Sequence, residues 1–154
     1  MGPVVAPRIA VVAIVGSRDY PNADVRVGER LRMLVQDWPD WDWLVVSGGA
    51  RGVDTEAIRA AERLKLRTHI IPAEWTVHGK VAGILRNQQI VDEVPPAERG
   101  NPSRVIAFWD FRSRGTKDTI KKAVLNGRAT EIWDAEGEPA GHDAAKEVFG
   151  ETAY

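Results

Sequence analysis

The feature that most constrains the fold is an apolar run that ends in glycines and passes into a helical pattern. Residues 44–46 (Leu-Val-Val) contain no alternating polar residue, which is typical of a strand buried on both faces. From Val53 onwards, apolar residues recur with the spacing of one helix face. Gly48, Gly49 and Gly52 lie between the two patterns. Either the glycines only permit a tight turn, or their backbone N–H groups and the helix N-terminus bind an anion.

The same alternation of apolar strand and amphipathic helix runs along the rest of the chain. It predicts an α/β fold, with a parallel sheet of about five strands and helices on both faces. A single domain is expected over residues 9–134, after a flexible leader at 1–8 and before a weakly ordered tail at 135–154. The other strands are predicted at residues 9–15, 67–72, 105–109 and 129–133.

Composition excludes several classes of function. The 154 residues carry a net charge of −1, so no general attraction to nucleic acid or anionic membranes is expected. There is no cysteine, and no two of the three histidines have the spacing of metal ligands, so neither a metal nor another cofactor is expected. The apolar segment at residues 9–15 is too short to span a membrane, and we expect a cytoplasmic protein without membrane contact.

Three polar turns follow predicted strands and therefore meet at one edge of the sheet. They are residues 16–19, 48–52 and 113–116, and parallel α/β sheets bind ligands at this edge. Arg18 either binds phosphate or pairs with Asp19, and Asp54 either caps its helix or accepts ribose hydroxyl groups. Thr116 is expected to cap the helix that follows it.

A polar and partly basic segment lies between the third and fourth strands. His78 stands at the entrance of a predicted helix that extends to about residue 93, and Lys80, Arg86 and Asn87 follow it. These side chains either face the predicted site or form a solvated helix face.

Residues 47–55 (Ser-Gly-Gly-Ala-Arg-Gly-Val-Asp-Thr) closely resemble the Ser-Gly-x-Ala-x-Gly-Ile-Asp motif of the Smf/DprA proteins, which load recombinase on single-stranded DNA. Gly16-Ser17-Arg18 matches their preceding turn. With Trp75, residues 78–80, Arg86-Asn87 and Gly115-Thr116, the chain is most similar to the YspA/YpsA-like branch of the SLOG superfamily, which also contains the LOG phosphoribohydrolases. The resemblance implies a Rossmann-like sheet with a nucleotide-type ligand at its edge.

One position departs from the LOG motif, in which a glutamate serves cleavage of the N-glycosidic bond. Thr119 stands where that glutamate would be, and Asp118 points about a third of a helical turn away. LOG-type hydrolysis is therefore an alternative rather than the main hypothesis. In this alternative the catalytic residues are Arg86, which holds the phosphate, and Asp118, which replaces the glutamate.

The main hypothesis from the sequence is a domain that binds a nucleoside phosphate or an ADP-ribose-like ligand. A second alternative is a single-stranded nucleic-acid binder that uses Arg51, Arg112 and Arg114 with Trp75 as a stacking platform. Nucleic acid is not the expected partner, whereas the resemblance to LOG dimers implies a homodimer. The expected ligand-binding residues are Gly16, Ser17, Arg18, Ser47, Gly48, Gly49, Arg51, Gly52, Asp54, His78, Lys80, Asn87, Arg114, Gly115 and Thr116.

Overall fold

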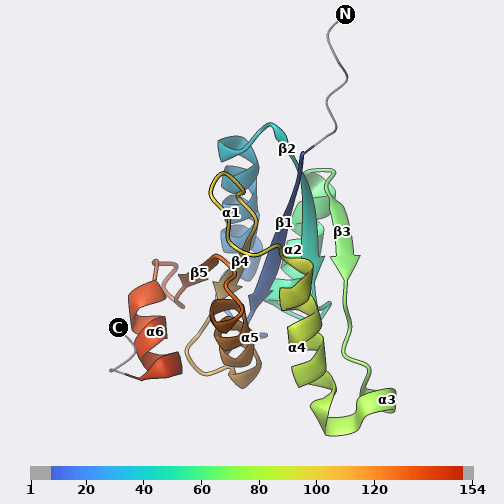
Figure 1. Ribbon diagram of the computed structural model, residues 1–154, viewed down its shortest axis with the longest axis vertical. Coiled ribbons are helices and arrows are strands. Elements are labelled where there is room, and N and C mark those ends of the chain that lie inside the picture. Colours follow the sequence, from blue (N-terminus) through green and yellow to red (C-terminus); the bar gives the residue numbers. More distant parts are fainter. Residues whose placement is uncertain (1–7, 151–154) are drawn as a thin grey trace, which may run out of the picture.

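Five parallel strands form one sheet in the order β3-β2-β1-β4-β5 (Figure 1). The structure is a computed structural model and describes residues 8–150. The predicted α/β fold, a Rossmann-like parallel sheet, is confirmed. The strands are β1 (Arg8–Gly16), β2 (Trp41–Ser47), β3 (Arg67–Ile70), β4 (Arg104–Phe108) and β5 (Thr130–Trp133).

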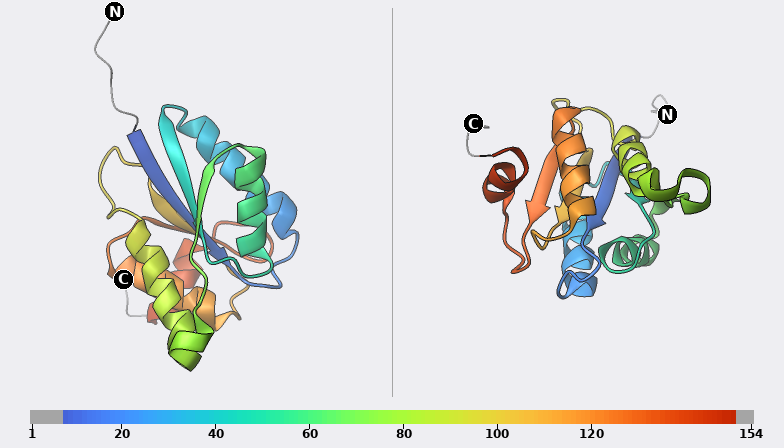
Figure 2. Two further views of the ribbon diagram at one scale, coloured as in Figure 1. Left: turned by 90° about the vertical axis from the view of Figure 1, so that its right-hand side faces the viewer. Right: turned by 90° about the horizontal axis from the view of Figure 1, so that it is seen from below.

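Helices cover both faces of this sheet (Figure 2). Helices α1 and α2 pack on one face, and α4, α5 and α6 pack on the other. None of the helices in residues 8–150 is long and apolar enough to span a membrane. Their bounds are α1 (Ala23–Asp37), α2 (Val53–Arg63), α3 (Trp75–His78), α4 (Ala82–Glu93), α5 (Arg114–Leu125) and α6 (Gly141–Phe149), with a 3₁₀ turn η1 (Gly79–Val81) between α3 and α4.

The continuous apolar sequence of β1 is explained by its central position. Successive side chains of a strand point to opposite faces, so Val12 and Ile14 join the core under α1 and α2. Val11 and Val15 join the core under α4 and α5. Both faces of β1 are thus buried, which explains why no polar residue alternates along this strand.

The strand order reverses beside β1, and this reversal locates the site. The chain moves outward from β1 to β2 and β3, then crosses back through α3 and α4 to place β4 on the other side of β1. At the carboxyl edge of the sheet, the chain therefore leaves β1 toward α1 on one face and leaves β4 toward α5 on the other face. A crevice at such a switch point is where parallel sheets bind ligands.

The two ends of the chain differ in part from the expectation. Strand β1 already begins at Arg8, and the rest of the predicted leader lies outside the described residues. In the predicted tail, residues 141–149 form helix α6, and Ala144 on this helix is fully buried against the β5 side of the core. Ala144 and the partly buried Val148, one helical turn apart, pack this helix against the core.

Candidate functional site

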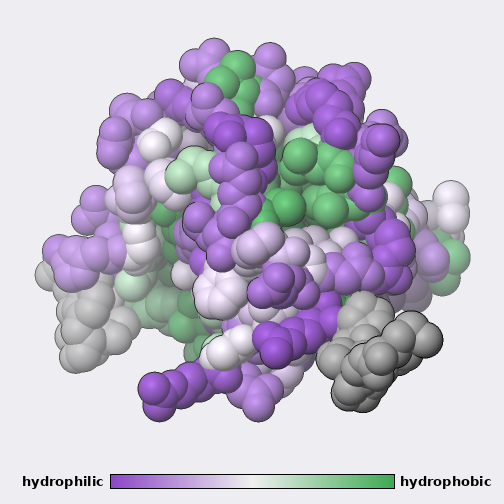
Figure 3. All heavy atoms as spheres, turned by 90° about the horizontal axis from the view of Figure 1, so that it is seen from above, coloured by the Kyte–Doolittle hydropathy of each residue, from purple (hydrophilic) through white to green (hydrophobic). Residues whose placement is uncertain are grey.

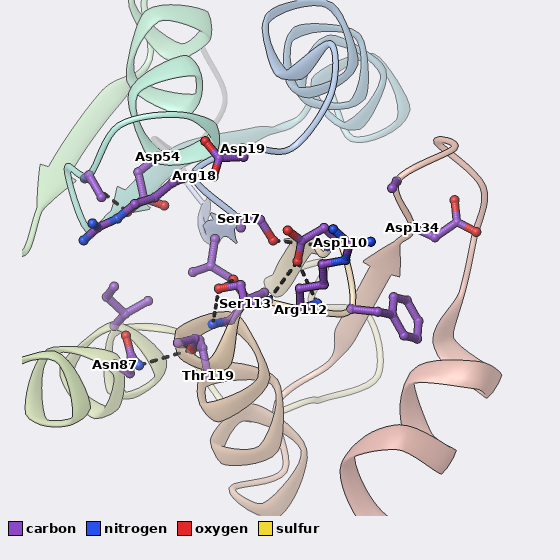
Figure 4. Close-up of a pocket in the computed structure, with 18 of the residues that line it drawn as sticks. Ser17, Arg18, Asp19, Asp54, Asn87, Asp110, Arg112, Ser113, Thr119 and Asp134 are labelled. Atoms are coloured by element: carbon purple, nitrogen blue, oxygen red, sulfur yellow. Dashed lines mark hydrogen bonds between the residues drawn. The ribbon is translucent and has the colours of Figure 1, made fainter.

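A cavity of about 960 Å³ opens at the carboxyl edge of the sheet (Figure 4). Its wall is formed by the segments that follow β1, β2, β4 and β5, together with one side of α4 and the start of α5. In Figure 4, Arg18 and Asp54 lie on one side and Asp134 lies on the other. The opposite end of the molecule, shown in Figure 3, is mainly hydrophilic with a smaller hydrophobic area.

The turn after β1 is fixed by close contact with β4. A Cβ at Gly16 would lie 2.6 Å from the carbonyl oxygen of Phe108, so only glycine fits there. The backbone N–H of Ser17 donates to that carbonyl at 3.0 Å, and the Ser17 hydroxyl accepts from the N–H of Asp110 at 3.1 Å. These bonds hold Arg18, which is exposed, at the cavity wall.

The turn after β4, which we call the β4–α5 turn (residues 109–113), is organised by Asp110. Its carboxylate accepts the N–H groups of Arg112 and Ser113, both at 2.9 Å. These bonds hold the pKa of Asp110 below its ordinary value, although burial opposes them. The Ser113 hydroxyl then accepts the N–H of Thr116 at 3.3 Å, so Ser113 caps α5 and the expectation that Thr116 is the cap is wrong.

The β2–α2 loop (residues 48–52) is packed against its own neighbours. A Cβ at Gly48 would lie 2.4 Å from a guanidinium nitrogen of Arg86, and one at Gly52 would lie 2.4 Å from the carbonyl oxygen of Arg18. The Arg86 guanidinium also donates to the Gly48 carbonyl at 3.0 Å. The start of α2 is therefore covered by the backbone at Arg18 rather than open to a ligand.

Asp54 lies in the first turn of α2, next to the β2–α2 loop, and its side chain lines the cavity. Its carboxylate accepts the N–H of Ala50 at 3.2 Å, so it supports the loop instead of capping α2. Burial raises its pKa from 3.8 to about 6, against the opposing effects of the Ala50 N–H, Arg86 and Arg18. The side chain is therefore a titratable group on the cavity wall.

Helix α4 contributes Arg86 and Asn87 to the wall. The Asn87 amide donates to the Gly115 carbonyl at 3.3 Å and to the Asp118 carboxylate at 3.0 Å, which joins α4 to α5. Asp118 also pairs with Lys122 one helical turn along α5. Because its carboxylate turns along the helix, Asp118 lies outside the cavity wall, whereas Thr119 lies on it.

The structure brings together only part of the predicted set. The following predicted residues line the cavity: Gly16, Ser17, Arg18, Asp54, Arg86, Asn87, Gly115 and Thr116. Ser47, Gly48, Gly49 and Gly52 lie outside its wall because they build the loop behind it. Arg51 pairs with Asp19 at 3.4 Å, and Arg114 is exposed on α5. His78 and Lys80 are exposed at α3 and η1, away from this wall.

Several cavity residues were absent from the predicted set. Asp110 and Asp134 follow β4 and β5 directly, so the rule that ligands bind at carboxyl strand ends points to both. The predicted set contained no residue of the β4–α5 turn, because Arg112 was named only in the nucleic-acid alternative, and residues 135–136 were assigned to the tail. The additional wall residues are Val15, Asp19, Ala50, Ile90, Asp110, Phe111, Arg112, Ser113, Thr119, Asp134, Ala135 and Glu136.

Five carboxylates and three guanidinium groups line the wall, but most of the carboxylates already have partners. Asp110 and Asp54 accept backbone N–H groups. Asp134 accepts the N–H groups of residues 136 and 138, and Asp19 pairs with Arg51. Within residues 8–150, neither the Arg18 nor the Arg112 guanidinium forms a hydrogen bond or an ion pair. Their N–H groups are therefore available to an anionic ligand, although Arg18 also acts electrostatically on the Asp54 carboxylate.

Two known proteins are similar to this chain. The X-ray structure of DNA processing protein A (DprA) from Streptococcus pneumoniae superposes with a TM-score of 0.61, at 18% identity, over 91% of this chain and 54% of that one. The Gene 61 protein of Mycobacterium phage D29 is 36% identical over 89 residues, which are 54% of this chain and 66% of the phage protein. This chain thus spans about half the length of the solved DprA.

The family model described as "DNA recombination-mediator protein A" matches residues 2–105, which is more than half of the chain. This match corrects two expectations from the sequence, namely that the ligand is a small nucleotide and that nucleic acid is not the expected partner. The low net charge led to the second expectation, whereas the first came from the three polar turns and from the resemblance to the YspA/YpsA-like branch. The chain belongs to the DNA recombination-mediator protein A family.

Proposed function

We propose that the cavity binds single-stranded DNA through the phosphate backbone and that the chain serves as a DNA-processing domain. The observation that carries this proposal is the first turn of α5, which lines the same cavity as Arg18 and Arg112, whose guanidinium groups form no hydrogen bond or ion pair within residues 8–150. Family membership supports DNA as the partner, and the resemblance of residues 47–55 to the Smf/DprA motif supports a single strand.

The chemistry of this part of the wall suits phosphate. The first turn of a helix leaves backbone N–H groups without intrahelical partners, and the helix dipole favours an anion there. Gly115 stands in this turn with no atom within 4 Å of the position of a Cβ, so a phosphate oxygen has room to approach the backbone. A guanidinium group can then bind two oxygens of the same phosphate.

The shape of the site favours a single strand over a duplex. The cavity is a hollow bounded by four loops and α4, and a nucleotide enters such a hollow only when its base is neither paired nor stacked in a duplex. Phosphates of an unpaired strand can follow the wall from Arg18 to Arg112 while the base lies in the hollow.

Fluorescence anisotropy with a labelled thymidine oligonucleotide of about 12 nucleotides tests the proposal. Arg18→Ala and Arg112→Ala are each expected to weaken binding by about tenfold, because each removes a charge-assisted phosphate contact. Each variant is also expected to lower the slope of log affinity against log salt by about 0.7. A competing duplex of the same length is expected to bind more weakly.

Arg59→Ala is the matched control, because Arg59 is an exposed arginine that pairs with Glu56 on α2 and lies outside the cavity wall. This variant is expected to bind as the unmodified protein does. Equal loss in all three variants, or no binding of the oligonucleotide at low salt, would refute the proposal.

A further inference from the structure

Helix α3, η1 and the first turn of α4 form an arm (residues 75–85) that extends beyond the carboxyl edge of the sheet (Figures 1 and 2). Large apolar side chains are unusually exposed on it. Trp75 is 55% exposed, Val77 is 68% exposed and Val81 is 50% exposed. Exposed apolar side chains that gather on one segment mark an interaction site.

Trp75 lies on the side of the arm that continues the cavity wall. Its Cη2 atom lies 3.4 Å from the position that a Cβ of Gly83 would occupy, so the indole packs over this glycine. Gly83, Asn87 and Ile90 recur at the spacing of one helix stripe on α4. Asn87 and Ile90 line the cavity, and Asn87 donates to the Gly115 carbonyl on α5. The indole therefore stands one helical turn beyond the wall, on the stripe that faces the proposed phosphate site.

The charges around Trp75 suit a polyanion. Lys80 on η1 and Arg86 on α4 are cations on either side of Gly83 in the sequence. Glu74 is the nearest carboxylate in the sequence, and its side chain lies 3.9 Å from His78. An exposed aromatic ring next to basic side chains is the combination that binds single strands, because bases stack on the ring while phosphates meet the cations.

From this arrangement we propose that Trp75 is a stacking platform for the nucleobase next to the nucleotide held in the cavity. The inference rests on the proposed function and extends its site from the cavity to the arm. The inference is based on the continuous stripe of Gly83, Asn87 and Ile90 on α4, because a DNA strand that leaves the α5 phosphate site along α4 passes over the indole. A second copy of the chain is the competing occupant of the arm.

The test compares Trp75→Ala, Trp75→Phe and the control Val77→Ala in oligonucleotide binding. Trp75→Ala is expected to weaken binding of the thymidine oligonucleotide by about tenfold, and Trp75→Phe by less, because phenylalanine keeps an aromatic face. Val77→Ala removes a more exposed apolar side chain of the same arm and is expected to bind normally. With an abasic oligonucleotide of equal length, the difference between Trp75→Ala and the unmodified protein is expected to disappear.

Failure of this inference differs from failure of the proposed function. If Trp75→Ala binds normally while Arg112→Ala binds weakly, the stacking platform is wrong and the phosphate site stands. If the unmodified protein binds no oligonucleotide, the proposed function itself is wrong. If analytical ultracentrifugation shows that Trp75→Ala and Val77→Ala both convert a dimer to a monomer without altering DNA affinity, the arm is an interface between copies, which also overturns the inference.

Discussion

The β2–α2 loop and the β4–α5 turn both follow a buried strand, both precede a helix, and both contain or adjoin glycine, yet the structure uses them differently. In the β2–α2 loop, Gly48 and Gly52 are packed against Arg86 and the backbone of Arg18. Next to the β4–α5 turn, Gly115 has no atom within 4 Å of the position of a Cβ and lies on the cavity wall. The first segment is a support and the second is open to a ligand.

This difference shows that glycines after a strand have two meanings that the sequence alone does not separate. In the β2–α2 loop the absence of a Cβ lets other parts of the protein approach the backbone. At the start of α5 it leaves space for a molecule from outside. The loop with more glycines, and with the more diagnostic motif, is the one that contributes less to the cavity wall.

Exchanging glycine for alanine at the two positions should give the largest contrast. Gly52→Ala is expected to lower the free energy of unfolding by about 2 to 4 kcal/mol, because Gly52 has a φ of 81° and its Cβ would overlap the Arg18 carbonyl. Gly115→Ala is expected to be neutral or to stabilise by up to about 1 kcal/mol, since alanine favours helices. Urea unfolding measures both changes. Similar losses in the two variants would contradict the distinction between support and open turn.

Asp54 offers a second contrast, because it supports the β2–α2 loop from a buried position. Because its pKa is raised to about 6 in the folded protein, Asp54 holds its proton between about pH 4 and pH 6 in the folded state. In the unfolded chain the same group is already ionised in this range. The contribution of this group to stability is therefore favourable at low pH and declines as pH rises through that window. Asp54→Asn removes the ionisation while keeping an oxygen for the Ala50 N–H.

Asp54→Asn is thus expected to stabilise the protein by about 2 to 3 kcal/mol at pH 8 and to have little effect near pH 4. DNA affinity of the unmodified protein is expected to rise as pH falls through about 6, where Asp54 takes up its proton, and the variant is expected to lack this rise. Thermal unfolding and anisotropy across this pH range check both expectations. A variant that is less stable at pH 8 would show that the carboxylate is needed in its charged form.

Substitution of Ser113 separates stability from binding in the β4–α5 turn. Ser113→Ala removes the cap of α5 and is expected to cost about 1 kcal/mol. Ser113→Asp retains a capping oxygen and complements the helix dipole, so stability is expected to be kept, while its charge repels phosphate and weakens DNA binding. Chemical unfolding and anisotropy measure the two effects. Unchanged DNA affinity in Ser113→Asp would place the phosphate away from α5.

The fold was predictable because the signals that specify it are local. Continuous apolar runs identified the buried strands, and their alternation with helical stripes identified the parallel sheet. Helix α6 was missed because its apolar stripe is short and consists mainly of Ala144 and Val148. The expectation that ligands bind at the carboxyl edge of the sheet followed from the same alternation.

The site was predictable only in part, because its details depend on contacts between distant residues. The Arg86 guanidinium meets the Gly48 carbonyl across 38 positions of the sequence, and the Asp110 N–H meets the Ser17 hydroxyl across 93. No spacing rule reveals such contacts. The sequence is consistent with Ser113 as the cap of α5, because a serine at the N-cap accepts the N–H of the residue three positions later. Threonine is also a favoured cap residue, so residue type alone does not decide between Ser113 and Thr116.

The most direct test of the account is an amide NMR titration of the isotopically labelled protein with a short thymidine oligonucleotide. The account predicts that the largest shift changes occur in residues 112–116 and at Arg18, with smaller changes in the β2–α2 loop. Largest changes in residues 48–52 would mean that the glycine-rich loop is the binding surface after all. Changes confined to helix α1 and the second half of α2, away from the cavity, would contradict the proposed DNA site.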